Sequence, residues 1–269
     1  MKKILILFLF IPLFSCNDWL NVEPEDSVTF VNYFKSEEEL KALHNGIASY
    51  MKNICIGKQP YFYNALDADN IEWTYQGFWT LDPDTYLPDE SMVLDVNWSG
   101  FYDAIYMANV MIENEYRFEN ISEERAKFWL GQDHFCKAMS YFRIAQIWGD
   151  APIAKGSESI APEGKRPALE VLEEAIREAK LALTLPVYEE LKDVDGKQIT
   201  SKQYASLGTV NTLLANIYAW MGGLTQEEKY WTEAEFYASE VIERRAGAYD
   251  LESMDGLISK VFGKARSSV

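Results

Sequence analysis

A helical period of apolar residues recurs along most of this chain of 269 residues and constrains its fold more than any other feature. Within 97–116, Phe101, Ile105, Ala108 and Ile112 stand three or four positions apart, which places them on one face of an α-helix. Five other stretches have a comparable period: 36–53, 122–148, 166–186, 201–223 and 229–251. Together they predict a mainly all-α fold.

The first of these helices has a clear start signal. Ser36 stands directly before it and Glu39 follows three residues later, the spacing of a capping box in which both side chains accept hydrogen bonds from free backbone N–H groups. One apolar stripe of this helix is expected to face the core: Leu40, Leu43, Ile47 and Tyr50.

The last two helices resemble a pair from a tetratricopeptide repeat (TPR). Gly222 and Gly223 follow the fifth helix, and we expect them to end it, as glycine often does. Small residues on that helix let a neighbour approach closely: Ala205, Gly208, Thr209, Thr212, Ala215 and Ala219. In the sixth helix the inner side is expected to carry Ala234, Ala238 and Ile242. The spacing is looser than the ideal 34-residue repeat, so the prediction is TPR-like helix pairs.

The N-terminus reads as a targeting segment. Lys2 and Lys3 precede an apolar run over 4–11, the charge-then-apolar order of a secretory signal. A membrane-spanning helix needs about 20 apolar residues, and this run is shorter. We therefore predict a signal peptide over 1–15.

The residues that follow the run resemble the lipobox of bacterial lipoproteins. Ser15 stands directly before Cys16, and Leu13 lies upstream; in a lipobox the cysteine is acylated and becomes the new N-terminus. Because more than one acyl chain gives stable anchoring, we expect Cys16 to hold the chain on a membrane, with 16–35 as the lipidated N-terminal segment. The alternative is an ordinary cleaved signal with a chance cysteine.

The stretch 54–97 loses the helical period and fills with glycine, proline, aspartate and aromatic residues. Loops longer than about 12 to 15 residues are usually functional or disordered, and the aromatic density argues against disorder. Sugars present apolar C–H faces that stack on aromatic rings, and hydroxyls that need planar polar partners. The segment contains both kinds of group, which makes it the predicted ligand-binding loop.

Seven residues of this loop are the candidate ligand-binding residues. Four aromatic residues are expected as stacking platforms: Trp73, Tyr75, Phe78 and Trp79. Three polar residues are expected as partners of sugar hydroxyls: Asp67, Asp69 and Asn70. The alternative is that the rings pack the loop onto the helices. For Trp98, Tyr102 and Trp148, which stand at predicted helix ends, packing is the expected role.

Charge and cysteine content exclude several classes of protein. The net charge of −17 disfavours nucleic acid and anionic lipid as partners drawn by the overall field. Apart from Cys16, only Cys55 and Cys136 remain, too few for a disulfide framework, and whether these two pair stays open. Cys136 lies within a helical pattern and is expected to pack as a small apolar residue.

Motifs typical of enzymes are missing from the sequence. It has no glycine-rich phosphate loop and no GxSxG, and no ligand spacing around His44 or His134 suggests a metal site. The motif DVDGK at 193–197 starts like a calcium loop but lacks the glutamate at position twelve, so we expect a turn. A glycoside hydrolase is a remote alternative, because 42 acidic residues bring carboxylates together by chance. We predict no catalytic residue, no metal and no cofactor.

Six stretches follow one another along the chain: CNDWLNVEP, WSGFYDAIYMANVMIE, KAMSYFRIAQIWGDAPI, RPALEVLEEAIREAKLALTLP, GTVNTLLANIYAWMGG and KYWTEAEFYASEVIE. Taken in this order, they resemble the SusD/RagB family of surface lipoproteins of Gram-negative bacteria. Two departures stand out. The stretch WLGQDHFCKA replaces the family's usual acidic-Leu-Arg-Ala lead into its third helix, and family members continue for a long C-terminal half. We therefore expect 36–269 to be a SusD-like helical domain that is incomplete at its C-terminus.

The resemblance implies a fold and a function. The fold is a SusD-like superhelix of TPR-like helix pairs with a long aromatic-rich loop insertion. The function is binding without catalysis: family members sit on a SusC-like TonB-dependent barrel in the outer membrane, exposed at the cell surface, capture oligosaccharides or peptides and pass them inward. Two alternatives remain, a TPR-like scaffold that binds only proteins and a non-functional truncated family member.

Overall fold

The computed structural model describes residues 33–56, 98–158, 163–200, 203–251 and 253–256. The predicted signal peptide and Cys16 lie outside these residues, as does nearly all of the predicted aromatic loop. The long helices are α2 (Glu37–Ile56), α5 (Ser99–Glu113), α6 (Glu123–Trp148), α7 (Ala168–Leu181), α8 (Leu207–Thr225) and α9 (Glu228–Ile242). The six predicted helices are confirmed, and so is the mainly all-α fold.

The shorter elements connect these helices. Three are 3₁₀ turns, η3 (Glu115–Arg117), η4 (Ala182–Thr184) and η5 (Tyr188–Glu190), and α10 (Met254–Gly256) is a single turn. The strands β1 (Ala151–Pro152) and β2 (Lys165–Arg166) pair antiparallel between α6 and α7. The predicted turn at 193–197 is confirmed, because the carboxylate of Asp193 accepts hydrogen bonds from the backbone N–H groups of Asp195 and Lys197.

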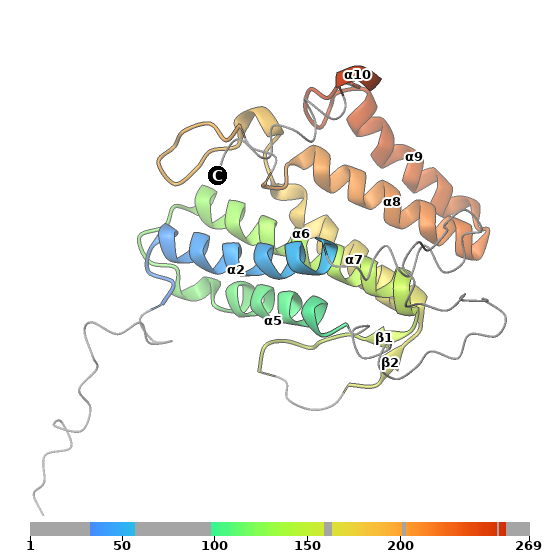
Figure 1. Cartoon of the computed structure of the whole chain (residues 1–269), viewed down its shortest axis with the longest axis horizontal. Helices are drawn as coiled ribbons and strands as arrows, with labels where there is room; N and C mark the ends of the chain where they lie inside the picture. The colour runs from blue at the N-terminus through green and yellow to red at the C-terminus, as the bar shows by residue number, and fades with distance from the viewer. Residues whose placement is uncertain (1–32, 57–97, 159–162, 201–202, 252, 257–269) are drawn as a thin grey trace, which may run out of the picture. The chain divides into compact units, whose positions relative to one another are not determined.

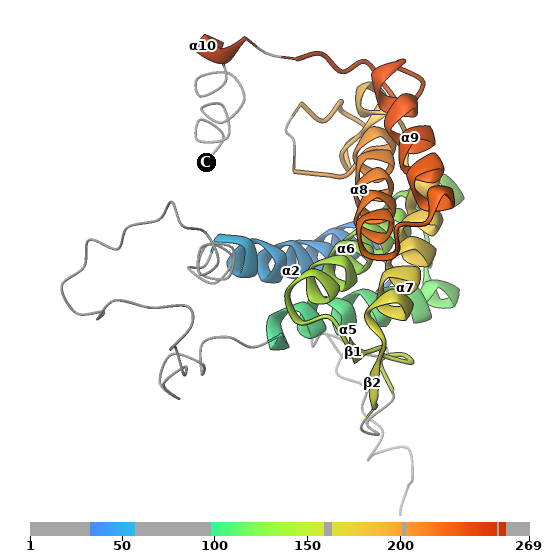
Figure 2. The same cartoon turned by 90° about the vertical axis from the view of Figure 1, so that its right-hand side faces the viewer.

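Consecutive helices pack as pairs within the unit that comprises residues 34–269. Helix α6 packs against α7, α7 against α8, and α8 against α9. On the other side of α6 lie α2 and α5, which also contact each other (Figure 1). Seen at right angles, α8 and α9 run side by side, and α2 lies beside α6 (Figure 2). The predicted TPR-like helix pairs are confirmed.

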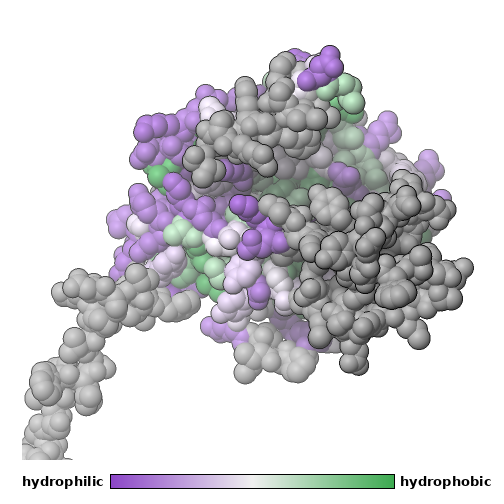
Figure 3. Space-filling view, in the orientation of Figure 1, coloured by the Kyte–Doolittle hydropathy of each residue, from purple (hydrophilic) through white to green (hydrophobic). Residues whose placement is uncertain are grey.

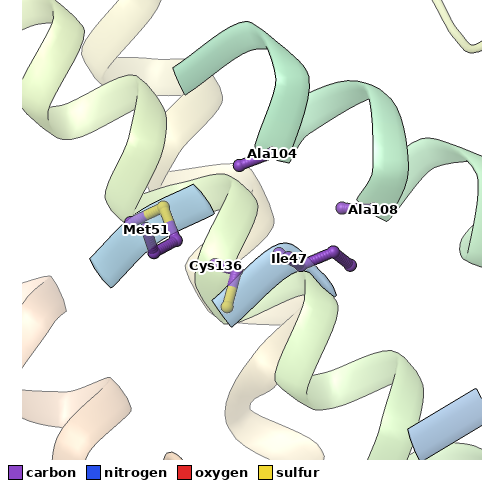
Figure 4. Close-up of a cluster of buried hydrophobic side chains, with 5 residues drawn as sticks. All are labelled: Ile47, Met51, Ala104, Ala108 and Cys136. Atoms are coloured by element: carbon purple, nitrogen blue, oxygen red, sulfur yellow. The ribbon is translucent and has the colours of Figure 1, made fainter. Parts of the chain in front are cut away.

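One part of the core lies where α2, α5 and α6 meet. Ile47 and Met51 of α2 pack there with Ala104 and Ala108 of α5 and with Cys136 of α6 (Figure 4). The two alanines let the helices approach closely, because a short side chain adds little between the backbones. Cys136 is a buried free thiol, and burial raises its pKa. It packs as a small apolar residue, as predicted.

Helix α2 begins as predicted and buries Leu40 and Ile47 of its predicted stripe. The backbone N–H of Glu39 donates to Ser36 Oγ, and that of Ser36 donates to the carboxylate of Glu39, so the capping box is confirmed. The expected burial of Tyr50 was wrong, because 41% of this residue is exposed. His44 and Met51 are buried instead. His44 faces inward because it pairs with the buried side chain of Asp133 on α6. A pattern of apolar residues does not reveal such a polar pair.

The end of α8 also differs from the prediction. The helix passes through Gly222 and Gly223 and ends at Thr225, where Gln226 takes the left-handed conformation with φ 59°. The ring of Trp231 in α9 lies directly against Gly222. Gly222 therefore permits a close helix contact.

The inner face of α9 was predicted correctly at one position and wrongly at another. Ala234 is buried, but Ile242 is 78% exposed. Tyr237 is buried instead of Ile242. The Tyr237 ring stacks on the ring of Tyr218 in α8, with 5.7 Å between centroids and 6° between planes. An aromatic stack between two helices thus determines which side of α9 faces α8.

Hydrophilic residues predominate among the coloured atoms of the face drawn in Figure 3, with hydrophobic areas between them. This agrees with the net charge of −17. Within the described ranges, no helix combines the length and the apolar character that a membrane span requires.

Candidate functional site

All seven candidate ligand-binding residues lie in the segment 57–97, outside the described residues. The candidates are Trp73, Tyr75, Phe78, Trp79, Asp67, Asp69 and Asn70, and their roles stay predictions. The first described residue after this segment is Trp98, directly before α5.

Trp98 belongs to a cluster of aromatic rings where α5 begins and α6 ends. Its ring meets those of Tyr102 and Trp148 edge-on, each at a centroid distance of 5.9 Å. Phe101 also contacts Trp148 at 5.9 Å, and the ammonium of Lys165 in β2 lies 5.4 Å from the Trp98 centroid. These contacts confirm the packing role predicted for Trp98, Tyr102 and Trp148.

Two phenols attach the segment after α6 to this cluster. The hydroxyl of Tyr102 donates to the backbone carbonyl of Pro152 at 2.6 Å, and the hydroxyl of Tyr141 accepts from the backbone N–H of Ala154 at 3.0 Å. Burial raises the pKa of Tyr102 to about 12, and it raises that of Tyr141 as well. The two hydrogen bonds hold the segment after α6 against α5 and α6.

A polar cluster lies between α6 and α7 around Glu178, whose side chain is 1% exposed. Its carboxylate oxygens lie 2.6 Å from His134 Nδ1, 2.8 Å from Lys137 Nζ and 2.5 Å from the Arg177 guanidinium. Burial alone would raise the pKa of Glu178, but the hydrogen bonds and charges of His134 and Lys137 outweigh it and lower the pKa to about 2. A carboxylate held ionised in this way is a structural tie between helices and is poorly suited to proton transfer.

The other histidine forms a buried pair with an aspartate. Nδ1 of His44 lies 2.7 Å from Oδ1 of Asp133, and the rings of Trp129 and Tyr204 lie 5.7 Å and 5.8 Å from the imidazole. Burial raises the pKa of Asp133, and the nearby His44 opposes that shift only in part. Because both side chains are buried, a substrate cannot reach the pair.

The described residues contain no group of three or more His, Cys, Asp or Glu side chains placed to hold a metal ion. They do contain an open pocket with a volume of 370 Å³, formed by α6, α8 and α9. Trp220 and Trp231 are among the residues that line it. The sequence analysis did not predict this pocket, because its residues come from three helices and share no local motif. Exposed tryptophans at the turn between two helices were the available signal.

The helix pairs define an all-α fold of the helical-repeat class, and sequence comparison identifies the family. Residues 18–222 match the SusD-like family model described as "Starch-binding associating with outer membrane". This match extends over more than half of the chain, so the protein belongs to the SusD/RagB family.

Individual relatives agree with this assignment. SusD-like protein P25 of Formosa agariphila is 25% identical over 159 residues, which is 55% of this chain and 30% of the relative. A SusD superfamily protein from Bacteroides thetaiotaomicron has a similar structure, with a TM-score of 0.68 and 20% identity over 84% of this chain and 52% of the other. Surface glycan-binding protein A from Bacteroides uniformis gives a TM-score of 0.52 and 16% identity, over 62% and 35%. The chain spans about half, or less, of the length of these relatives.

Proposed function

We propose that this protein binds oligosaccharides at the outer surface of the outer membrane and delivers them to a SusC-like TonB-dependent barrel. The observation that carries the proposal is the match of residues 18–222 to a family described as starch-binding and associated with the outer membrane. The fold similarity to a protein named as a surface glycan-binding protein supports it. A peptide ligand is the alternative within the same family role.

The proposed attachment is a lipid on Cys16. Residues 1–15 would be removed as the signal peptide, 16–35 would connect the anchor to the fold, and 36–269 would form the SusD-like helical domain. The support is the order of charge, apolar run, small residue and cysteine at the N-terminus. Mass spectrometry of the protein from bacterial membranes tests this directly: an acylated Cys16 supports the anchor, and an unmodified Cys16 contradicts it.

The proposed ligand site is the aromatic segment that precedes Trp98. Trp73, Tyr75, Phe78 and Trp79 would stack on sugar rings, and Asp67, Asp69 and Asn70 would bind hydroxyls. The support is the density of aromatic and polar residues within the segment 54–97. Such a site binds and does not cleave, so the proposal includes no catalytic residue and no cofactor.

A double variant tests the ligand site. Trp73→Ala combined with Trp79→Ala should lower affinity for an oligosaccharide such as maltoheptaose at least tenfold, which is about 1.4 kcal/mol, with unchanged helical content. Tyr116→Ala is the matched control, since Tyr116 is an aromatic residue that is 84% exposed on η3. Unchanged affinity in the double variant would remove the loop assignment and leave the fold assignment intact.

A second candidate function is a scaffold that binds only proteins. It is favoured by the exposed apolar side chains of α9, among them Phe236 and Ile242, because apolar residues on a surface often mark a protein interface. Capture of the tagged protein from native outer membranes separates the two functions. A co-purified TonB-dependent barrel together with binding of a glycan supports the delivery role. Protein partners without any glycan binding support the scaffold.

A further inference from the structure

The pocket between α6, α8 and α9 has the properties of a ligand site. It is lined by Phe142 and Gln146 from α6, by Asn216 and Trp220 from α8, and by Trp231 from α9. Its volume of 370 Å³ lies within the range of small-ligand pockets, which is about 300 to 1,000 Å³. None of these residues belongs to the loop proposed above as the ligand site.

Both tryptophan rings of the pocket are held in place and yet remain accessible. Trp231 is 47% exposed, and its indole lies against the backbone of Gly222. Trp220 is 40% exposed, and its ring meets Phe142 edge-on with 6.5 Å between centroids. Rings that are fixed before binding lose little conformational entropy when a ligand stacks on them. They therefore suit a flat apolar surface such as the C–H face of a sugar.

The two amide side chains of the pocket each have one group available. Asn216 Nδ2 donates to the backbone carbonyl of Thr212 at 2.8 Å, which leaves Oδ1 as an acceptor. Gln146 Oε1 accepts from the Arg143 guanidinium at 3.0 Å, which leaves Nε2 as a donor. An acceptor and a donor beside aromatic rings match a hydroxyl-rich neutral ligand.

Charge decides between ligand classes. No residue among those described as lining the pocket carries a charge, so an anionic or cationic ligand would lose its hydration without gaining an ionic partner. We propose that this pocket is a second glycan site that binds neutral hexopyranose units. The choice of a glycan rests on the proposed function, whereas the placement of the site rests on the two rings and the two amides.

The test is fluorine NMR on the full chain in detergent, labelled with 5-fluorotryptophan. The probes are maltoheptaose, cellohexaose and mannohexaose, and Trp220→Phe and Trp231→Phe assign the two signals. We expect both signals to shift in a saturable manner with at least one probe. Asn216→Ala should weaken that response at least fivefold without altering the fold, since Asn216 is an exposed helical residue. Ile242→Ala is the control, because this exposed α9 residue lies outside the pocket lining.

The outcomes separate this site from the proposed function. Calorimetric binding of a probe without any shift of the Trp220 and Trp231 signals overturns the second site and leaves the proposed function standing. No binding of any probe by either method overturns both. A response to the neutral peptide acetyl-tetraglycine amide but to no glycan overturns the ligand class. Saturable shifts that persist in the Trp73→Ala/Trp79→Ala variant support a site separate from the loop.

Discussion

The indole of Trp231 in α9 lies so close to Gly222 in α8 that a β-carbon at position 222 would stand 2.7 Å from its Cε2 atom. Real Cβ atoms do not approach this closely, so any side chain at 222 must displace the ring. The next residue, Gly223, has no neighbouring atom within 4 Å of such a position. Two adjacent glycines in one helix thus have different roles.

The first prediction compares alanine at these two glycines. Gly222→Ala should lower the free energy of unfolding by about 1 to 3 kcal/mol, the usual cost of overpacking. Gly223→Ala should raise it by about 0.5 to 1 kcal/mol, because alanine favours a helix interior over glycine. Chemical denaturation followed by circular dichroism measures both. Equal effects of the two substitutions would mean that the contact of Trp231 with Gly222 does not contribute to stability.

The same contact shows why the sequence misplaced the end of α8. A pair of glycines is a common helix stop, and nothing local distinguishes a stop from a position where a distant ring must approach. The ring is supplied by Trp231, which lies in the first turn of α9. The contact of Trp231 with Gly222 is visible only in the packing of α8 against α9.

The second prediction concerns the pH dependence that Glu178 confers. Its pKa falls from 4.5 to about 2 in the folded state. A lowered carboxyl pKa contributes stability that is present above the unfolded pKa and is lost as the pH falls toward the folded pKa. The contribution, on the order of 3 kcal/mol, should therefore disappear between about pH 4.5 and pH 2, and Glu178→Gln should flatten the stability curve in that window.

A matched control for Glu178 is Glu123→Gln. Glu123 also pairs with a lysine, Lys127, but on the exposed surface of α6, and exposed ion pairs contribute little. Urea unfolding measured at several pH values should show a clear loss of pH dependence for Glu178→Gln and almost none for Glu123→Gln. Similar curves for both variants would contradict the structural role of the Glu178 cluster.

The sequence predicted the helices better than the buried contacts between them. Apolar period, caps and breakers located all six long helices, because those signals are local. The buried polar pairs were not predicted, since His44 and Asp133 stand 89 residues apart and look like surface residues in their own helices. This explains why the predicted inner face of α2 included Tyr50 and missed His44.

The third prediction tests the buried pair itself. His44→Ala should destabilise the fold by about 1 to 3 kcal/mol, because it leaves the buried side chain of Asp133 without its hydrogen-bond partner. The double variant His44→Leu with Asp133→Leu should be less destabilised than the sum of its single variants, since removing both polar groups removes the desolvation cost. Thermal unfolding of the unaltered protein, the two single leucine variants and the double leucine variant measures this coupling. Additive effects would contradict it.

The proposed ligand sites could be predicted from the sequence only in part. Composition singled out the loop as the candidate site, because aromatic and polar residues are dense within one short segment. The pocket between α6, α8 and α9 escaped detection, since Phe142 and Trp231 are far apart in sequence and each fits the pattern of its own helix. Sites assembled from distant helices require the tertiary structure.

The last prediction concerns the start of α8, against which Tyr249 packs. Its ring lies against Gly208, and its hydroxyl lies 2.7 Å from Oγ of Ser206, the N-cap residue that accepts from the backbone N–H of Thr209. Tyr249→Phe should cost about 1 kcal/mol, the usual value of one hydrogen bond. Ser206→Ala should cost about 1 to 2 kcal/mol, because it removes the cap as well.

Hydrogen exchange distinguishes these two variants of the α8 start. Ser206→Ala should speed exchange of the first-turn amides of α8, including that of Thr209, because the capped N–H loses its acceptor. Tyr249→Phe should leave those amides protected, since the cap itself remains. Equal exchange in both variants would contradict this expectation. It would mean that the Ser206 cap forms only when the hydroxyl of Tyr249 is bonded to it, so that this hydrogen bond determines where α8 begins.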